Sequence, residues 1–327
     1  PFHGRRMAGY EETMREIAAR EIESWPTGVS YPLRPRMQAM TLDIILATVF
    51  GIQGGERLAP LREALRAFPD MLTDPRFIVP MLAITPARIR SFPPFRRRVD
   101  RVAALIGSEI ADRRDAADLE ERDDILSLLV AARHEDGLPM SDAEIHDELL
   151  TLLVAGHETT ATALSWAVER LIRHPDKLVR LREEVEAGEE AYLTATIQET
   201  LRLRPVIVIV IRRLTEAIQL GGYDLPAGVN VVPSIHLVHR DPTIYPEPDA
   251  FRPERFLEAP PGTYTWIPFG GGVRRCLGAA FAQQEMAIVL RELVARRQVR
   301  PTDPAAERPF RRAITETPRH NAEVVLS

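Results

Sequence analysis

The stretch Phe269-Gly270-Gly271-Gly272-Val273-Arg274-Arg275-Cys276-Leu277-Gly278 holds the single cysteine of this 327-residue chain. A helical pattern follows it at once, from Ala279 to about Ala295. Cys276 is therefore expected at a helix N-terminus, where unpaired backbone N–H groups and the helix dipole stabilise a thiolate. Arg274 and Arg275 add positive charge, and the glycines let the backbone pass close to a flat, bulky group. We interpret the segment as a site that holds sulfur as an anion.

Other uses of a glycine-rich run or a lone cysteine fit this segment less well. A dinucleotide-binding loop needs a third glycine where Arg275 stands, and a phosphate-binding loop needs a Gly-Lys-Ser/Thr ending. Cys-x-x-Cys-His, which attaches c-type haem covalently, is absent from the sequence. A single cysteine also excludes an internal disulfide and any zinc or iron–sulfur site made from several cysteines. A lone cysteine is more often a small apolar core residue, so the interpretation depends on the local pattern.

The bulk composition is that of a globular protein, with 45% apolar and 27% charged residues. A net charge of -5, with acids and bases interspersed, provides no basic stripe and argues against a nucleic-acid partner. No run approaches the roughly 18 apolar residues that a membrane-spanning helix needs. The first seven residues resemble the interior of a domain, so we expect the natural N-terminus to lie further upstream.

The first half of the chain has a helical pattern. Apolar residues recur three and four apart in stretches such as 40–49 and 102–110. Ser141-Asp142-Ala143-Glu144 is a capping box, and the helix that it opens is expected to continue to Arg173, where His174-Pro175 ends it. At about 1.5 Å per residue this helix is roughly 45 Å long. Prolines within about 68–98 predict short helices joined by turns.

The second half adds small sheets. The β-branched run Val-Ile-Val-Ile-Val-Ile at 206–211 predicts a strand, and Ile218 to Leu220 with Gly221-Gly222 predicts a hairpin. A proline-rich stretch from Pro242 to Gly272 is interpreted as a packed meander because aromatic residues recur along it. No repeat or break in composition marks a boundary, which favours a single domain over 1–327.

The 269–278 segment resembles the ten-residue haem-ligand signature of the cytochrome P450 family of haem-thiolate monooxygenases at every defining position. Glu199-Thr200-Leu201-Arg202 is similar to the Glu-x-x-Arg helix motif of that family, and Phe251-Arg252-Pro253-Glu254-Arg255-Phe256 to the meander segment that completes the same ion-paired network. The resemblance implies a cytochrome P450 fold that is mainly α with small β-sheets. A long central helix would then lie over haem b, and a loop with the axial thiolate of Cys276 beneath it.

Ala155-Gly156-His157-Glu158-Thr159-Thr160 puts a glycine in the middle of the long helix, at a cost of about 1 kcal/mol relative to alanine. The resemblance implies that Ala155 and Gly156 lie beside the haem, and that Glu158 and Thr159 are the acid and alcohol of the oxygen-binding groove. A carboxylate and a hydroxyl can relay the protons that splitting O2 requires. For an arbitrary helix, a threonine bonded to its own backbone and a solvent-exposed glutamate are more usual. His157 is expected to be a packing or surface residue.

The resemblance also implies the remaining cofactor contacts. Cys276 would ligate the iron, with Phe269, Gly270 and Gly278 around it, and Arg274 and Arg212 would pair with the haem propionates because arginine binds carboxylates in a bidentate manner. Arg213 is an equally suitable neighbour of Arg212. Apolar residues are the expected pocket walls for a lipophilic substrate: Leu152, Ala155 and 206–211.

Electrons are expected from a separate ferredoxin or flavodoxin type donor, because the chain has no flavin or nicotinamide motif. Basic residues that could attract an acidic donor are Arg274, Arg275, Arg291, Arg296 and Arg297, the last three of which fit a solvated helix face equally well. The expected enzyme is a cytoplasmic monomer that uses O2 to hydroxylate its substrate. About a hundred N-terminal residues of the family pattern, where a membrane anchor could lie, are not in the sequence, and the junction near 185–191 is short for the family.

Two other hypotheses remain open at this point. A non-catalytic haem-binding or gas-sensing protein would need Cys276 but neither Glu158 nor Thr159. A haem-free scaffold that binds a protein or a lipid would need none of the three.

Overall fold

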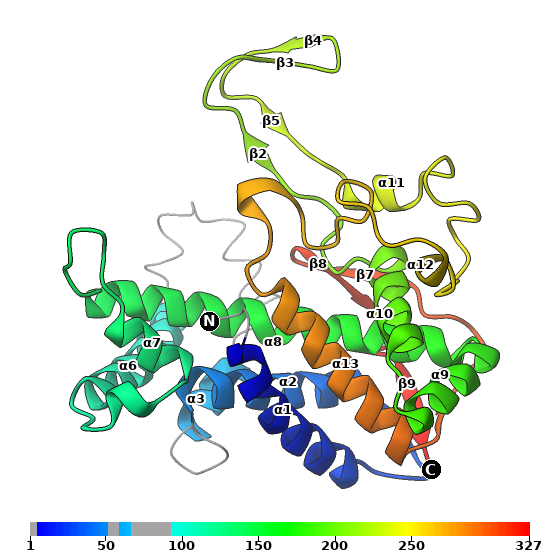
Figure 1. The fold of residues 1–327 in the computed structure, drawn as a ribbon, viewed down its shortest axis with the longest axis horizontal. Helices are drawn as coiled ribbons and strands as arrows, with labels where there is room; N and C mark the ends of the chain where they lie inside the picture. The colour runs from blue at the N-terminus through cyan, green and yellow to red at the C-terminus, as the bar shows by residue number, and fades with distance from the viewer. Residues whose placement is uncertain (1–4, 52–58, 67–92) are drawn as a thin grey trace.

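A long central helix, α8 (Asp142–Ile172), organises the computed structural model, which describes residues 5–51, 59–66 and 93–327 (Figure 1). Its N-terminus has the predicted capping box: Glu144 N–H donates to Ser141 Oγ (3.3 Å), and Ser141 N–H donates to the Glu144 carboxylate (2.8 Å). The helix ends three residues before Pro175, as expected, because a proline disfavours helical backbone in the residue that precedes it. The short helices predicted within 68–98 fall largely outside the described residues.

Helices make up most of the described chain, as the sequence predicts. The other α-helices are α1 (Arg5–Ser24), α2 (Arg34–Phe50), α3 (Ala59–Arg66), α6 (Pro93–Arg114), α7 (Ile125–Ala131), α9 (Pro175–Ala187), α10 (Ala191–Leu203), α11 (Ile235–His239), α12 (Arg255–Glu258) and α13 (Ala279–Arg296). Two 3₁₀ turns are η3 (Leu119–Glu121) and η4 (Gly272–Arg274). None of the helices within the described ranges is long and apolar enough to cross a membrane.

The core forms where α2 and α13 pack against α8, with α1 against both α2 and α13. Helix α2 is buried over most of its circumference, and residues 160–172 of α8 are buried without exception. The middle of α8 differs, because Thr151, Val154 and Ala155 are exposed there. The C-terminal half of α8 is therefore core, whereas one face of its middle part is left for other contacts.

The strands are short and pair antiparallel in four small sheets, with the order β1-β9-β6 in the largest. They are β1 (Ser30–Pro32), β2 (Arg212–Arg213), β3 (Ile218–Leu220), β4 (Tyr223–Leu225), β5 (Asn230–Val231), β6 (Val299–Pro301), β7 (Pro309–Arg312), β8 (Thr315–Pro318) and β9 (Glu323–Leu326). The strand predicted at 206–211 is wrong, since only an isolated bridge joins Ile209 to Ser234. Val206 packs in the core, Ile207 lines a cavity, residues 208–210 are half-buried and Ile211 is 59% exposed, so packing explains only the first part of this β-branched run.

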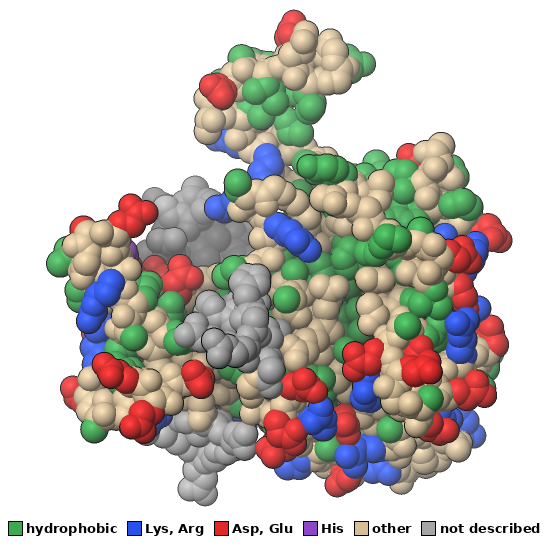
Figure 2. All heavy atoms as spheres, in the orientation of Figure 1, with side chains coloured by type: hydrophobic (Ala, Val, Ile, Leu, Met, Phe, Trp, Pro, Cys, Tyr) green, Lys and Arg blue, Asp and Glu red, His purple; other side chains and the backbone are tan. Residues whose placement is uncertain are grey.

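The predicted hairpin is confirmed as β3 and β4, with Gly221 (φ 57°) and Gly222 (φ 84°) in the turn between them. Both positions are left-handed, which glycine adopts at little cost. With β2 and β5 the hairpin forms an arm that projects from the helical body (Figure 1). Hydrophobic side chains are exposed along this arm (Figure 2), among them Ile218, Leu220 and Tyr223.

Candidate functional site

The 269–278 segment forms a tight loop that leads directly into α13 (Figure 1). The N–H of Cys276 donates to the carbonyl of Phe269 (2.9 Å), which closes the loop. Gly270 (φ 69°) and Gly272 (φ 62°) adopt the left-handed backbone that this closure needs. Cys276 is exposed and lies two residues before Gly278, the N-cap of α13. The cysteine thus sits just ahead of the helix N-terminus where it was expected.

A buried histidine supports the start of this loop. His239 Nε2 accepts a hydrogen bond from the Ile267 N–H (2.9 Å), so in the neutral ring Nδ1 carries the proton and donates to the Arg202 carbonyl (3.1 Å). Burial lowers the pKa of His239 to about 4, with the positive charge of Arg202 acting in the same direction. The imidazole is therefore neutral at physiological pH and ties helix α10 to the chain just before Phe269. Nothing in the sequence pattern singled out His239.

The Glu-x-x-Arg motif and the meander arginine meet in a buried ion-paired network, as predicted. Arg202 donates to the Glu199 carboxylate through Nε (2.7 Å) and a terminal nitrogen (2.9 Å), and both side chains are fully buried. Arg255 Nε contacts the same carboxylate (3.1 Å). Arg202 also donates to three backbone carbonyls of the meander region: His239 (2.7 Å), Pro248 (2.8 Å) and Ala250 (3.2 Å). This network fixes the meander from which the cysteine loop emerges.

Aromatic rings continue this support along the meander, which is packed as predicted. Phe256, Trp266 and Phe269 follow one another edge to face, with centroids 6.3 and 6.0 Å apart. The Trp266 indole N–H donates to the Gln198 carbonyl of α10 (3.0 Å). The cysteine loop is therefore held by α10 through a histidine, an ion pair and a tryptophan.

The space next to the loop suits a flat, largely apolar group with acidic substituents. A Cβ built on Gly270, Gly271 or Gly278 would meet no atom within 4 Å. Leu277 is 61% exposed beside the cysteine, an unusual position for a large apolar side chain. Within the described ranges, neither Arg212 on β2 nor Arg274 on η4 has an acidic partner, although Arg212 donates to the Ile211 carbonyl (2.9 Å). Haem, with an apolar ring and two propionates, fits these residues.

Gly156 faces α2. A Cβ on Gly156 would lie 3.3 Å from Cδ1 of Ile45, closer than most real Cβ contacts. The glycine thus allows α2 and α8 to approach closely, which compensates for its poor helix propensity. Its expected place beside the haem remains a prediction, and so does that of the neighbouring Ala155, which is exposed.

Glu158 is held by α2. Its carboxylate accepts a hydrogen bond from Arg34 (2.7 Å) and another from Gln38. Arg34 is 2% exposed and also donates to the side chain of Asn321 (3.0 Å). The usual case of a solvent-exposed glutamate does not hold here, because the Glu158 side chain is 17% exposed and paired. An arginine and a glutamine four residues apart in a mostly buried helix were the only sequence signal for this contact.

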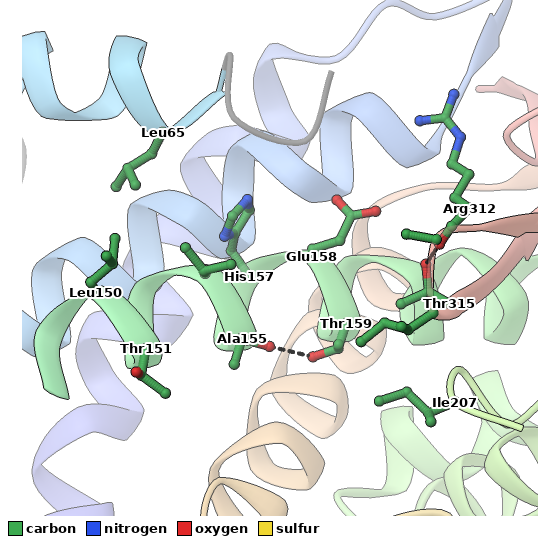
Figure 3. Close-up of a pocket in the computed structure, with 13 residues that line it drawn as sticks. Leu65, Leu150, Thr151, Ala155, His157, Glu158, Thr159, Ile207, Arg312 and Thr315 are labelled. Carbon is green, nitrogen blue, oxygen red and sulfur yellow. Dashed lines mark hydrogen bonds between the residues drawn. The ribbon is translucent and has the colours of Figure 1, made fainter. Parts of the chain in front are cut away.

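Thr159 donates its hydroxyl to the carbonyl of Ala155 (2.7 Å), one turn earlier in α8 (Figure 3). This is the self-bonded arrangement that is usual for threonine in a helix. The oxygen keeps its acceptor lone pairs, because only its proton is used. His157, two residues before Thr159, is buried and contacts the Leu153 carbonyl through Nδ1 (2.7 Å), which confirms a packing role.

A cavity of about 550 Å³ opens on this part of α8 (Figure 3). Its lining is mostly apolar and comes from α3, α8, the 206–211 run and the β7–β8 hairpin. Glu158 and Thr159 lie side by side on its wall, with Ala155 one turn away. Ile207 lines the cavity as expected, whereas Leu152 packs against the core instead. The other lining residues are Leu65, Leu150, Thr151, Val154, His157, Arg312, Ala313, Ile314 and Thr315.

The basic residues around the cysteine divide into two groups. Arg291 pairs with Glu190 (2.6 Å), and Arg296 pairs with Glu23 (2.8 Å) and Glu292 (2.7 Å). Arg297 donates to the carbonyl of Glu23 (3.1 Å). Arg274 and Arg275 are exposed and form no ion pair with the part of the chain that the structure describes. Only these two combine exposure near Cys276 with an uncompensated charge.

Comparisons with known proteins agree on one family. The sequence model of the family described as Cytochrome P450 matches residues 1–321. A Mycobacterium tuberculosis (strain H37Rv) protein named cytochrome P450 135B1 is 45% identical over 332 residues, which cover 99% of this chain and 70% of that protein. Another protein of the same strain, named cytochrome P450 138, is 40% identical over 337 residues, which cover 100% of this chain and 74% of that protein. The structure of retinoic acid bound cyanobacterial CYP120A1 is similar to this chain with a TM-score of 0.87 and 27% sequence identity. The match covers 100% of this chain and 76% of the cyanobacterial chain.

Proposed function

Because the chain belongs to the cytochrome P450 family and has the fold of that family, we propose that it inserts one oxygen atom from O2 into a lipophilic organic substrate. Members of this family are haem-thiolate monooxygenases. The observation that carries the proposal is that Glu158 and Thr159 lie next to each other on the wall of a mostly apolar cavity. Both belong to α8, the helix against which α13 packs. A gas sensor that only binds haem has no use for this pair.

We propose that Cys276 is the axial ligand of haem b. When bound, thiolate-ligated haem supplies the activation of O2. The proposed contacts with the rest of the cofactor are Phe269, Gly270, Gly278, Ala155 and Gly156 at the ring and Arg274 and Arg212 at the propionates.

The residues of the chain itself handle protons. Thr159 Oγ1 can accept a hydrogen bond from water in the cavity while its own hydroxyl proton is donated to the Ala155 carbonyl. The Glu158 carboxylate, fixed by Arg34 and Gln38, can hold the other end of such a water. The pair would thus order water beside the oxygen-binding position and pass protons inward.

The test has two steps. Reduced wild-type protein exposed to carbon monoxide should show the strongly red-shifted Soret band of a thiolate-ligated haem, and Cys276→Ala should lose that band. Thr159→Ala should then keep its haem but consume electrons without forming oxygenated product. Thr151→Ala is the matched control, since Thr151 lines the same cavity and makes the same bond to its own helix (2.7 Å to Asp147 O). A wild-type protein that binds haem but forms no oxygenated product would favour the sensor hypothesis. Equal product yields for Thr159→Ala and Thr151→Ala would remove Thr159 from the proposed proton path.

We further propose that an acidic electron donor of ferredoxin or flavodoxin type docks over Arg274 and Arg275, in the cytoplasm. Unpaired, exposed charges accelerate the encounter of oppositely charged proteins, and salt screens this effect. Arg275→Glu should therefore slow reduction by the donor and weaken the salt dependence of the reduction rate. Arg291→Gln is the control, because the charge of Arg291 is already compensated by Glu190.

The substrate is proposed to be lipophilic because the cavity is mostly apolar. Retinoic acid, which is bound in the similar cyanobacterial structure, is a lipophilic molecule of this general kind.

A further inference from the structure

The cavity on α8 contains one cation that nothing in the described part of the chain neutralises. Of its described lining residues, only Glu158 and Arg312 belong to the constantly charged types. The charge of Glu158 is balanced by Arg34 at 2.7 Å. Arg312 forms no ion pair or side-chain hydrogen bond with any described residue. The wall of a mostly apolar cavity therefore has a net positive charge at one place.

The β7–β8 hairpin determines where this cation points. Arg312 is the register partner of Thr315, and side chains opposite each other in an antiparallel pair lie on the same face. Thr315 is buried, and both Thr315 and Arg312 line the cavity. The Arg312 side chain extends away from Thr315, Thr159 and Ile207, which puts its guanidinium at a distance from the part of the cavity that they line (Figure 3). The Thr315 hydroxyl donates to the Arg312 carbonyl (3.0 Å), which fixes the backbone at this point. The neighbouring Arg311 lies on the opposite face of the strand, as the partner of Glu316.

An arginine beside apolar surface loses part of its hydration, and an anion bound there restores the lost stabilisation. The planar guanidinium matches a carboxylate through two parallel hydrogen bonds. A phosphate dianion would call for a second cation, and the described lining supplies none. A single arginine in a hydrocarbon-lined cavity thus matches a molecule with one negative charge and a long or bulky apolar body.

We propose that the substrate is a lipophilic carboxylic acid, whose carboxylate binds Arg312 while its hydrocarbon part lies along Leu65, Leu150 and Ile207. This inference rests on the proposed function, because it assigns a substrate class to the same cavity. Arg312 is a specificity-determining residue in this scheme and takes no part in proton transfer. The acid should bind more tightly than its ester by roughly tenfold or more, the usual difference for a charge-assisted hydrogen bond.

The experiment compares acids with their methyl esters. Dodecanoic, hexadecanoic and abietic acids and the three esters are titrated into haem-loaded protein, and affinity is measured by calorimetry and by the spin-state change of the Soret band. Wild type should prefer at least one acid over its ester by about tenfold. Arg312→Gln should lose this preference while its affinity for the ester stays the same. Arg312→Lys, which keeps the charge but loses the planar fork, should show an intermediate preference.

Arg311→Gln is the matched control, since it removes the same charge from the opposite face of the same strand, and it should keep the preference for the acid. Equal affinity of wild type for every acid and its ester would overturn the proposal. So would an Arg312→Gln variant that still prefers the acid, or one that loses haem, because Arg312 would then serve the cofactor. Calorimetry does not depend on turnover, so a preference for acids can be measured even if the oxygenase test fails. An active oxygenase that binds acids and esters equally well would likewise be recognised.

Discussion

Replacing Arg202 with methionine would remove a guanidinium that is fully buried between α10 and the meander. The change breaks two hydrogen bonds to Glu199, at 2.7 and 2.9 Å, and takes the donor from three backbone carbonyls. Breaking a buried ion pair by removing one partner costs about 3–5 kcal/mol. Each carbonyl left unpaired costs about 1–3 kcal/mol, although these terms overlap because one group serves all five contacts.

We therefore expect Arg202→Met to lose at least about 4 kcal/mol of folding free energy. For a chain of this size that loss lowers the melting temperature by roughly 8 °C. The assay is thermal unfolding of the haem-loaded protein, followed by far-UV circular dichroism. Since the meander leads to the cysteine loop, the fraction of haem with the thiolate-type carbon monoxide spectrum should fall as well.

Two further variants make this prediction sharper. Arg202→Lys keeps the charge but cannot reach all five acceptors, so it should recover less than half of the loss. Arg101→Met is the control, because Arg101 pairs with Glu63 at 3.3 Å while both side chains are more than half exposed, and exposed pairs contribute little. An Arg202→Met protein that melts within about 2 °C of wild type would refute the reasoning, since it would mean that water or a rearranged meander satisfies the five acceptors.

Three further changes test other buried groups. Burial raises the pKa of Glu285 well above its ordinary value of 4.5, so stability falls as pH rises from that value. Glu285→Gln should therefore melt at a higher temperature than wild type at pH 8 and lose this advantage toward pH 4.5. A difference in melting temperature that does not change with pH would contradict the raised pKa. Burial lowers the pKa of His239 from 6.5 to about 4, so stability falls as pH drops through that window. His239→Gln should flatten this fall in pH-dependent melts, whereas His239→Leu should also weaken the thiolate-type spectrum because the Ile267 N–H loses its acceptor. Gly156→Ala should lower the free energy of unfolding in urea by about 1 kcal/mol, since crowding against Ile45 outweighs the better helix propensity of alanine. Adding Ile45→Val should restore the urea midpoint. An unchanged midpoint in the single variant would mean that α2 shifts without cost to accommodate the methyl group.

Several parts of the fold could be predicted because they depend on residues close together in the sequence. The capping box joins Ser141 to Glu144 within one turn, and Cys276 closes its loop onto Phe269 seven residues away. The β3–β4 turn needs only two glycines with positive φ. In such short-range interactions both partners lie within a few residues of each other, so the residue types in a short stretch of sequence are enough to predict them.

Contacts between segments far apart in the chain decided the rest. The 206–211 run has the composition of a strand but forms an isolated bridge, because the segment that it meets at Ser234 continues at once into helix α11. The mid-helix Gly156 was interpreted as space beside a cofactor, which stays a prediction, but its close approach to Ile45 of α2 could not be read from the sequence. The 185–191 junction looked short, and there Gly188 caps α9 in a left-handed conformation, with only residues 189–190 between it and the start of α10.

The sequence by itself determined the family, the cysteine loop and the helical frame, since a glycine-rich loop and helix caps are local patterns. Only the tertiary structure decided the surroundings of these features. Arg34 is 124 residues from the Glu158 that it neutralises, and Ile267 is 28 residues from the histidine that holds it. Whether the charge of Arg312 is balanced depends on which strands and helices meet at one cavity. That meeting is a property of packing, which no single segment of the chain encodes.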